Sequence, residues 1–176
     1  MKALIIGAAG FVGKYLLAHL SETYPWQLYA TKLPQEDIQF DHATILDLNI
    51  LEKEEILQTL KEIQPDYIFH LAAQSSVALS WKKPALTVDI NIKGCLNLLD
   101  AIREADLSPK ILLIGSGEEY GHISSENIPV SEGTLPRPGN IYAATKVCQN
   151  MIGSIYAQAY HMDVMLVRAF NHIGPE

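Results

Sequence analysis

The sequence has few cationic side chains and no apolar run long enough to span a bilayer. Only 13 Lys and Arg residues stand against 20 Asp and Glu residues, which leaves a net charge of −7, and the cations form no basic cluster. This balance argues against nucleic acids and anionic membranes as partners. No signal-peptide pattern is present, since Met1 and Lys2 lead directly into the first apolar run.

Cysteine is also scarce, and its two instances, Cys95 and Cys148, both fall in segments with a helical pattern. Two isolated cysteines favour reduced thiols in a cytoplasmic protein over a disulfide framework. The spacing of His, Cys and carboxylate residues indicates no metal site. The length and the 48% hydrophobic content fit one globular domain over residues 1–176.

Short apolar runs typical of buried strands alternate with amphipathic helical patterns. Strands are predicted over residues 2–6, 27–31, 43–46, 67–71, 110–114 and 164–167. Helices are predicted over residues 11–20, 50–63, 85–105 and 141–160, the second capped by Asn49 with Glu52 in the capping-box position. A long polar loop over residues 122–140 suggests a function. This order predicts an α/β fold of Rossmann type, a doubly wound parallel sheet with helices on both faces.

A glycine-rich turn, residues 7–13, lies between the first predicted strand and the first predicted helix. Backbone N–H groups and the helix dipole can hold a pyrophosphate at such a turn. Gly7 permits the tight turn, Gly10 allows close approach of a cofactor, and Gly13 lets helix and strand pack. A nucleoside-triphosphatase loop is excluded, because Ala8 replaces its first glycine and Tyr15 its magnesium-binding hydroxyl residue. A helix-start turn without a ligand is the alternative.

Tyr142 and Lys146 are four residues apart in a predicted helix and therefore project from one face. A free phenol has a pKa near ~10 and a free lysine near ~10.4, so neither is useful at neutral pH unless its pKa is shifted. We expect the Lys146 ammonium to lower the pKa of Tyr142, so that the phenol can protonate a carbonyl oxygen as hydride arrives. Ser116, just past an apolar strand, can hold that oxygen by a second hydrogen bond. A solvated helix pair is the alternative.

The end of the second predicted strand bears on the choice of dinucleotide. Sites that prefer NAD place an Asp or Glu about 20 residues after the glycines, to bind the ribose hydroxyls. Here the chain reads Tyr29-Ala30-Thr31-Lys32, without a carboxylate. A hydroxyl and a cation suit a 2′-phosphate better, which favours NADP(H), with NAD(H) as the alternative. Lys32 could instead face solvent.

Seven sequence marks together resemble a known family: Gly7-x-x-Gly10-x-x-Gly13, Asp47-Leu48, His70-Leu71-Ala72-Ala73-Gln74, Asn91 with Gly94, Ser116 with Glu118 and Tyr120-Gly121, Tyr142-x-x-x-Lys146, and Arg168-x-Phe170-Asn171-His172-x-Gly174-Pro175. They are similar to the extended short-chain dehydrogenase/reductases, in the nucleotide-sugar branch of the NAD-dependent epimerase/dehydratase family. The resemblance covers essentially the whole chain.

The resemblance implies a role for each matching residue. Tyr142 would be the catalytic acid, Lys146 its partner and a ribose ligand, and Ser116 the hydroxyl that orients the carbonyl. The implied cofactor-binding residues are Gly7, Gly10, Phe11, Val12, Gly13, Thr31, Lys32, Asp47, Leu48, Leu71, Ala72, Ala73, Asn91, Tyr142 and Lys146. The implied substrate-binding residues are Gln74, Ser75, Glu118 and Asn171. Asp47 could instead be a turn residue, and His70 is expected to be a hydrogen-bonded core histidine.

The resemblance also implies a reaction, the reduction of the 4-keto group of a nucleotide sugar, with conversion of GDP-4-keto-6-deoxymannose to GDP-rhamnose as the nearest match. A 4,6-dehydratase or a 4-epimerase of the same branch is the first alternative. Dehydratases use a glutamate at the position of Glu118, but Gly117 lacks the polar side chain they usually place beside it. This difference favours simple reduction. A non-catalytic dinucleotide-binding fragment is the second alternative.

Members of this family continue past the position of Pro175 into a smaller domain that grips the substrate, and these 176 residues do not include it. We therefore expect cofactor binding with weak turnover. The sheet is also expected to lack a seventh strand, and the exposed edge would favour association as a homodimer.

Overall fold

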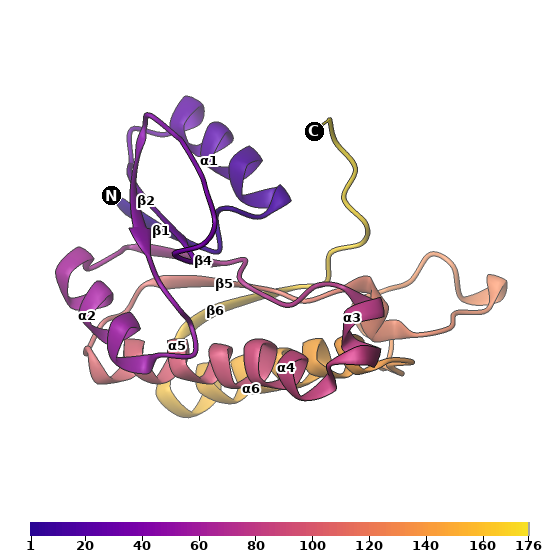
Figure 1. The fold of residues 1–176 in the computed structure, drawn as a ribbon. Helices are drawn as coiled ribbons and strands as arrows, with labels where there is room; N and C mark the ends of the chain where they lie inside the picture. Colours follow the sequence, from indigo (N-terminus) through magenta and orange to yellow (C-terminus); the bar gives the residue numbers. More distant parts are fainter. Residues whose placement is uncertain (176) are drawn as a thin grey trace.

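The computed structural model describes residues 1–175, which are built on a six-stranded parallel sheet (Figure 1). The strands are β1 (Lys2–Ile6), β2 (Gln27–Lys32), β3 (Ala43–Asp47), β4 (Tyr67–His70), β5 (Lys110–Ile114) and β6 (Asp163–Val167). Their order is β3-β2-β1-β4-β5-β6, and each neighbouring pair is parallel. The order reverses between β1 and β4, and in such sheets ligands bind beyond the carboxyl ends of the strands at this switch point.

The helices lie on both faces of the sheet, as predicted (Figure 1). One face carries α1 (Phe11–Thr23), and the other carries α2 (Lys53–Ile63), α5 (Gly94–Glu104) and α6 (Ile141–Tyr160). Shorter elements join them: α3 (Val77–Lys82), α4 (Pro84–Val88), the π-helix η1 (Asp89–Lys93), and the 3-10 turns η2 (Gly117–Tyr120) and η3 (Ser125–Asn127).

The central strand β1 is buried on both faces, which explains its unbroken apolar run. Its side chains alternate between two core clusters. Ala3 and Ile5 pack on the α1 side with Leu17, whereas Leu4 and Ile6 belong to the cluster that includes α2 and α5. This two-sided burial fixes β1, and therefore places the glycine turn that follows it at the carboxyl edge of the sheet.

The predicted start of α2 is wrong. The helix begins at Lys53, and its N-cap Glu52 makes no side-chain capping bond. Asn49 forms a local turn instead, because its Oδ1 accepts a hydrogen bond from the Leu51 amide at 3.1 Å. An Asn side chain competes in this way with the helix for nearby backbone amides.

The predicted helix over residues 85–105 is interrupted. The segment starts at Pro84, and the π-helix η1 separates α4 from α5. The six-residue helix α3 was not predicted, since it is too short to display a helical period. Its N-cap is Ser76, whose hydroxyl accepts a hydrogen bond from the Leu79 amide at 3.1 Å. The bounds of α6 agree with the prediction, and β1 and β5 do so as well.

Strand β6 forms one edge of the described sheet, and the side chain of Met165 on it is 62% exposed. Within residues 1–175, no helix combines the length and the apolar character that crossing a membrane requires.

Candidate active site

A cleft of about 1210 Å³ lies at the carboxyl ends of the strands, beside the glycine turn. Most residues that the sequence singled out line it: Gly7, Gly10, Phe11, Val12, Gly13, Thr31, Lys32, Asp47, Leu48, Leu71, Ala72, Ala73, Ser75, Ser116, Glu118, Tyr142, Lys146 and Asn171. Two others, Asn91 and Gln74, are buried behind the wall of the cleft. The fold thus gathers residues from the whole length of the chain around one cavity.

The glycine turn has the geometry of a phosphate cradle. Gly7 has a φ of +83°, and a Cβ there would lie 2.6 Å from the backbone of Ala72. A Cβ on Gly13 would lie 2.1 Å from the carbonyl oxygen of Ala8, so α1 can approach β1 only with glycine at this position. A Cβ on Gly10 would meet only the Gly7 oxygen, at 3.5 Å, which leaves open space on that side.

The N-terminus of α1 is available to an anion. Its N-cap, Gly10, has no side chain that could cap the first amides, and the first turn contains no acidic residue. Helix N-termini of this kind bind phosphate through their amides and the helix dipole. The open cradle and the uncapped helix together fit the pyrophosphate of a dinucleotide.

The ends of β2 and β3 form the next part of the cleft wall. The Lys32 ammonium donates to Asp47 Oδ1 at 2.6 Å, so this cation is held by a neighbouring carboxylate. The Thr31 side chain is 1% exposed, and its hydroxyl accepts from the Gly7 amide at 3.3 Å. Thr31 thereby supports the glycine turn from behind, whereas Lys32 and Asp47 face the cleft.

Asn91 and Gln74 form a buried hydrogen-bond cluster. Asn91 Oδ1 accepts from the Gln74 amide at 2.8 Å, and its Nδ2 donates to the Gln74 carbonyl and to Thr145 Oγ1 at 3.0 and 2.9 Å. The Gln74 side chain is engaged by Ser76 and Thr87. Asn91 therefore joins the π-helix η1 to α6 one residue before Lys146, and Thr145 and Thr87 are partners that the sequence reasoning missed.

Tyr142 lies in the first turn of α6, whose N-cap Asn140 accepts from the Ala143 amide at 2.8 Å. Burial raises the pKa of Tyr142, and the Glu118 and Glu119 carboxylates add to this rise. The nearby Ser116 hydroxyl partly offsets it. The prediction that Lys146 lowers this pKa is wrong for this structure, because desolvation dominates. The phenol is thus held protonated, in the form that can donate a proton.

Lys146 is almost completely buried, and its ammonium donates to the Ile114 carbonyl at 2.8 Å and to Gln149 Oε1 at 3.1 Å. Burial lowers the pKa of Lys146 to about 8. Gln149, which also donates to the Ile114 carbonyl, was not found from the sequence. Its position three residues after Lys146, on the same helix face, is the signal that could have revealed it.

A buried ion pair supports the turn that carries Ser116. Glu119 is fully buried, and its carboxylate accepts from the Ser116 amide at 2.8 Å, from Asn150 Nδ2 and from Arg168 Nε at 3.1 Å. Arg168 also donates to Tyr120 and to the carbonyl of Glu132 in the long loop. Sequence reasoning gave Glu119 no role, although Ser116-x-x-Glu119 has the spacing of a capping box, which the structure contains.

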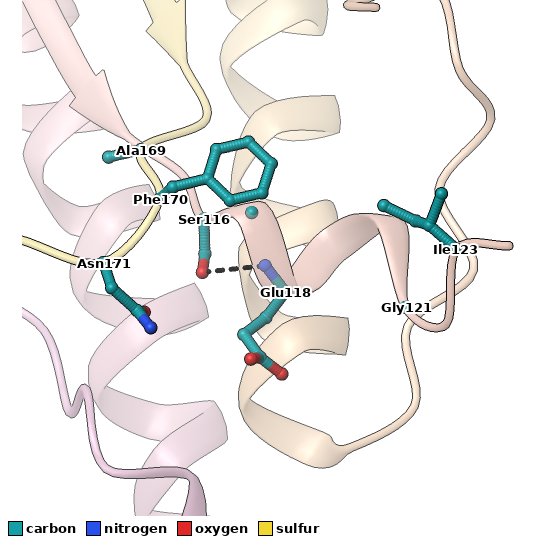
Figure 2. A pocket seen from close by; sticks show the side chains of 8 residues that line it. Ser116, Glu118, Gly121, Ile123, Ala169, Phe170 and Asn171 are labelled. Atoms are coloured by element: carbon teal, nitrogen blue, oxygen red, sulfur yellow. Dashed lines mark hydrogen bonds between the residues drawn. The ribbon is translucent and has the colours of Figure 1, made fainter. Parts of the chain in front are cut away.

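A smaller pocket of about 200 Å³ adjoins Ser116 (Figure 2). Figure 2 shows Ser116 between Asn171 and Glu118, with its hydroxyl accepting from the Glu118 amide at 3.2 Å. The Glu118 carboxylate accepts from Asn140 Nδ2 at 3.0 Å. Phe170 covers Gly117, where a Cβ would come within 2.7 Å of the ring. A polar side chain at residue 117 would therefore displace Phe170.

His70 differs from its prediction. It is buried at the end of β4, but neither ring nitrogen has a hydrogen-bond partner among the described residues. Burial lowers the pKa of His70 to about 3, so the ring is neutral. Within residues 1–175, no group of three or more His, Cys, Asp or Glu side chains could hold a metal ion.

The cleft therefore combines a dinucleotide cradle with two hydroxyls and a buried amine. A dinucleotide in the cradle would supply a hydride, Tyr142 can supply a proton, and Ser116 can hold the oxygen that receives it. The arrangement suits a coupled transfer of hydride and proton to or from a carbonyl group.

Known proteins share this organisation. A family model described as GDP-mannose 4,6 dehydratase matches residues 4–176. GDP-6-deoxy-D-mannose reductase of Pseudomonas aeruginosa is 34% identical over 99% of this chain and 53% of its own length. GDP-mannose 4,6-dehydratase of Yersinia enterocolitica is 31% identical over 99% of this chain and 50% of its own length.

Solved structures agree with the sequence matches. The structure of RMD from Pseudomonas aeruginosa complexed with NADPH has a TM-score of 0.82 at 33% identity, over 99% of this chain and 56% of that one. UDP-glucose 4-epimerase from Brucella ovis in complex with NAD has a TM-score of 0.89 at 26% identity, over 97% and 52%. The chain spans about half the length of the curated relatives it matches. It belongs to the NAD-dependent epimerase/dehydratase family of extended short-chain dehydrogenase/reductases.

Proposed function

We propose that residues 1–176 form the cofactor-binding and catalytic part of an NAD(P)-dependent reductase that acts on the 4-keto group of a nucleotide sugar. One observation carries the proposal: Ser116 and Tyr142 line the same cleft as the glycine cradle and Lys146. A protonated phenol beside a hydroxyl suits the protonation of a carbonyl oxygen. The same residues, Ser116, Tyr142 and Lys146, are the proposed catalytic set.

Each residue of the site has a defined task in this reaction. When bound, the dinucleotide supplies the hydride that reaches C4 of the sugar. Ser116 holds the carbonyl oxygen, and Tyr142 transfers its phenolic proton to that oxygen. The Lys146 ammonium lies one helical turn beyond Tyr142 and would bind the ribose of the dinucleotide. The buried Glu119 keeps the Ser116 backbone in place.

The proposed substrate is GDP-4-keto-6-deoxymannose and the product GDP-rhamnose. The likeness to GDP-6-deoxy-D-mannose reductase supports this choice. The pocket beside Ser116 offers the Glu118 carboxylate and the Asn171 amide to sugar hydroxyls. Phe170 over Gly117 supports reduction over dehydration, since it occupies the space of a polar side chain at residue 117.

The proposed cofactor is NADP(H), with NAD(H) as a second ligand. Lys32 at the end of β2 supports this choice, as does the likeness to RMD of Pseudomonas aeruginosa, solved with NADPH. The Thr31 hydroxyl is excluded from a role at the 2′-phosphate, because it is buried against Gly7. Asp47 and Leu48 would border the adenine.

Two further properties belong to the proposal. We expect a homodimer, because edge strand β6 and the exposed apolar residues Met151 and Ile155 on α6 favour association. We also expect a cytoplasmic protein, in keeping with its two free cysteines. Neither nucleic acid nor membrane is a proposed partner.

A 4,6-dehydratase or 4-epimerase is the main alternative, since relatives with both activities match the chain. NADPH consumption separates the reactions, because the alternatives need no external reductant in net. We would mix the protein, in excess, with NADPH and GDP-4-keto-6-deoxymannose and follow the nicotinamide absorbance. Loss of one NADPH per sugar is expected, with Tyr142→Phe as the control that lacks the proton donor. A parallel reaction with GDP-mannose in place of the keto sugar tests the alternative. Conversion of GDP-mannose without net NADPH loss, with no reduction of the keto sugar, would contradict the proposal and favour a lyase or epimerase.

A non-catalytic dinucleotide-binding fragment is the remaining alternative, suggested by the share of the relatives that these residues span. NADPH binding without NADPH loss and without conversion of GDP-mannose would support it. We expect turnover that is slow but dependent on Tyr142.

A further inference from the structure

We propose that Asp47 is a specificity-determining residue, because its ion pair with Lys32 weakens the attraction of that cation for a 2′-phosphate and keeps the preference for NADP(H) over NAD(H) small. The inference rests on the proposed function, since it concerns the dinucleotide cleft described above.

The sheet itself builds this ion pair. Lys32 and Asp47 are direct partners in the parallel register of β2 and β3, and the Leu48 amide donates to the Lys32 carbonyl at 2.8 Å. The Lys32 ammonium donates to Asp47 Oδ1 at 2.6 Å and to the Leu33 carbonyl at 3.3 Å. Two of its three N–H donors are therefore engaged by fixed acceptors. The pair is a consequence of strand register and not a chance meeting of two flexible surface side chains.

The exposed fractions of the Lys32 and Asp47 side chains show that the ion pair lies at the surface of the cleft. The Lys32 side chain is 17% exposed and the Asp47 side chain 58% exposed, and both residues line the cleft. A ligand can therefore reach the ammonium, but only with the Asp47 carboxylate beside it.

The surrounding charge is unfavourable for a phosphate. Glu36, whose carboxylate accepts from the Leu33 amide at 2.8 Å, lines the same end of the cleft. Two carboxylates thus border one ammonium there. Among the described residues that line the cleft, the other lysine is Lys146, which is buried beside Tyr142. Among these lining residues, the lysine that a 2′-phosphate could reach is thus already paired with a carboxylate.

The size of the effect follows from the strength of such pairs. A partly exposed ion pair is worth at most a few-fold in an equilibrium constant, because water screens it. Removal of the Asp47 charge should therefore raise the selectivity for NADP⁺ over NAD⁺ by about fivefold at low salt. High salt should reduce this gain, since exposed charges are screened.

The test compares the dissociation constants of NADP⁺ and NAD⁺, which differ only in the 2′-phosphate, by calorimetry at low salt. Asp47→Asn removes the charge and keeps a hydrogen-bonding side chain of the same shape. The ratio Kd(NAD⁺)/Kd(NADP⁺) cancels any change the asparagine causes at the adenine. A ratio raised about fivefold over wild type supports the proposal. An unchanged or lowered ratio overturns it.

A second pair of variants separates the ion pair from direct repulsion between Asp47 and the phosphate. In a Lys32→Met background, Asp47→Asn should change the ratio by less than about twofold, because no cation remains to be released. A full fivefold change in that background would show simple repulsion and overturn the role of the pair.

The outcomes also separate this inference from the proposed function. Binding of both dinucleotides with a ratio insensitive to Asp47→Asn contradicts the inference alone. Binding of neither NADP⁺ nor NAD⁺ by the wild-type protein contradicts the dinucleotide site itself, and the inference with it.

Discussion

Individual residues in the cleft carry charge states that their surroundings set. Burial raises the pKa of Tyr142 and lowers the pKa of Lys146 to about 8. The phenol is therefore a neutral acid, and the ammonium is charged at neutral pH but loses its proton at a lower pH than an ordinary lysine. Lys146 retains its charge through acceptors supplied by Ile114 and Gln149.

The buried Lys146 predicts a pH dependence of stability. Its folded pKa of about 8 lies below the ordinary value of 10.5, so between these values the unfolded chain binds more protons. Stability must then rise with pH across that window. Relative to Lys146→Met, the wild-type free energy of unfolding should increase by about 2 kcal/mol between about pH 7 and pH 10. Urea denaturation of wild type and Lys146→Met across that pH range measures this difference. If the free energies of unfolding of the two proteins change with pH in parallel, the lowered pKa of Lys146 is refuted.

The Glu119–Arg168 pair predicts a coupling energy. Arg168→Met leaves the fully buried Glu119 carboxylate without its cation and should cost about 2 to 3 kcal/mol of stability. Adding Glu119→Gln removes the stranded charge, so the double variant should be more stable than the sum of the two single losses. A double-mutant cycle by urea denaturation gives the coupling. Lys53→Met, which breaks an exposed ion pair with Glu104, is the control and should change the free energy of unfolding little. If the stability losses of the Glu119 and Arg168 variants simply add, the account is contradicted.

At the scale of the elements, the glycine turn contains one glycine that packing requires, Gly13, and one that ligand binding requires, Gly10. Gly13→Ala places a Cβ against the Ala8 carbonyl and should destabilise the fold by about 2 kcal/mol. Gly10→Ala meets no close atom, so the free energy of unfolding should stay within about 0.5 kcal/mol of wild type. The added methyl group faces the ligand instead, and NADPH binding should weaken at least about tenfold. Calorimetry measures the NADPH affinity of each variant, and thermal unfolding measures its stability. If Gly10→Ala binds NADPH as tightly as wild type, the pyrophosphate does not bind at this turn.

Elements with a long, clear period could be predicted from the sequence, and those shaped by tertiary contacts could not. The limits of α6 and the apolar strand β1 were predicted because their patterns are local. The π-helix η1 was missed, and Asn91 within it bonds to Gln74 and Thr145, which are distant in sequence. In the candidate site, spacing singled out the glycines and Tyr142 with Lys146, and the structure places them around one cleft. Their supports, Glu119, Gln149 and Arg168, were assigned no role because those roles arise only from contacts in the folded chain.

At the scale of the whole molecule, one sheet brings the glycine turn and the start of α6 to the same edge. The glycine turn follows β1, and Ser116 follows β5, two strands away in the sheet. Because parallel strands end at a common edge, residues more than a hundred positions apart share one cleft. The chain spans about half the length of its curated relatives, so slow turnover by residues 1–176 is part of the account.

The central claim is the transfer of hydride and proton to a sugar carbonyl in this cleft. The most direct test is a single-turnover reaction with GDP-4-keto-6-deoxymannose and NADPH deuterated at the transferring position of the nicotinamide, followed by mass spectrometry of the sugar. The account predicts one deuterium at C4 of the GDP-rhamnose product, and none with Tyr142→Phe. An unlabelled product, or label transfer that does not depend on Tyr142, would contradict it.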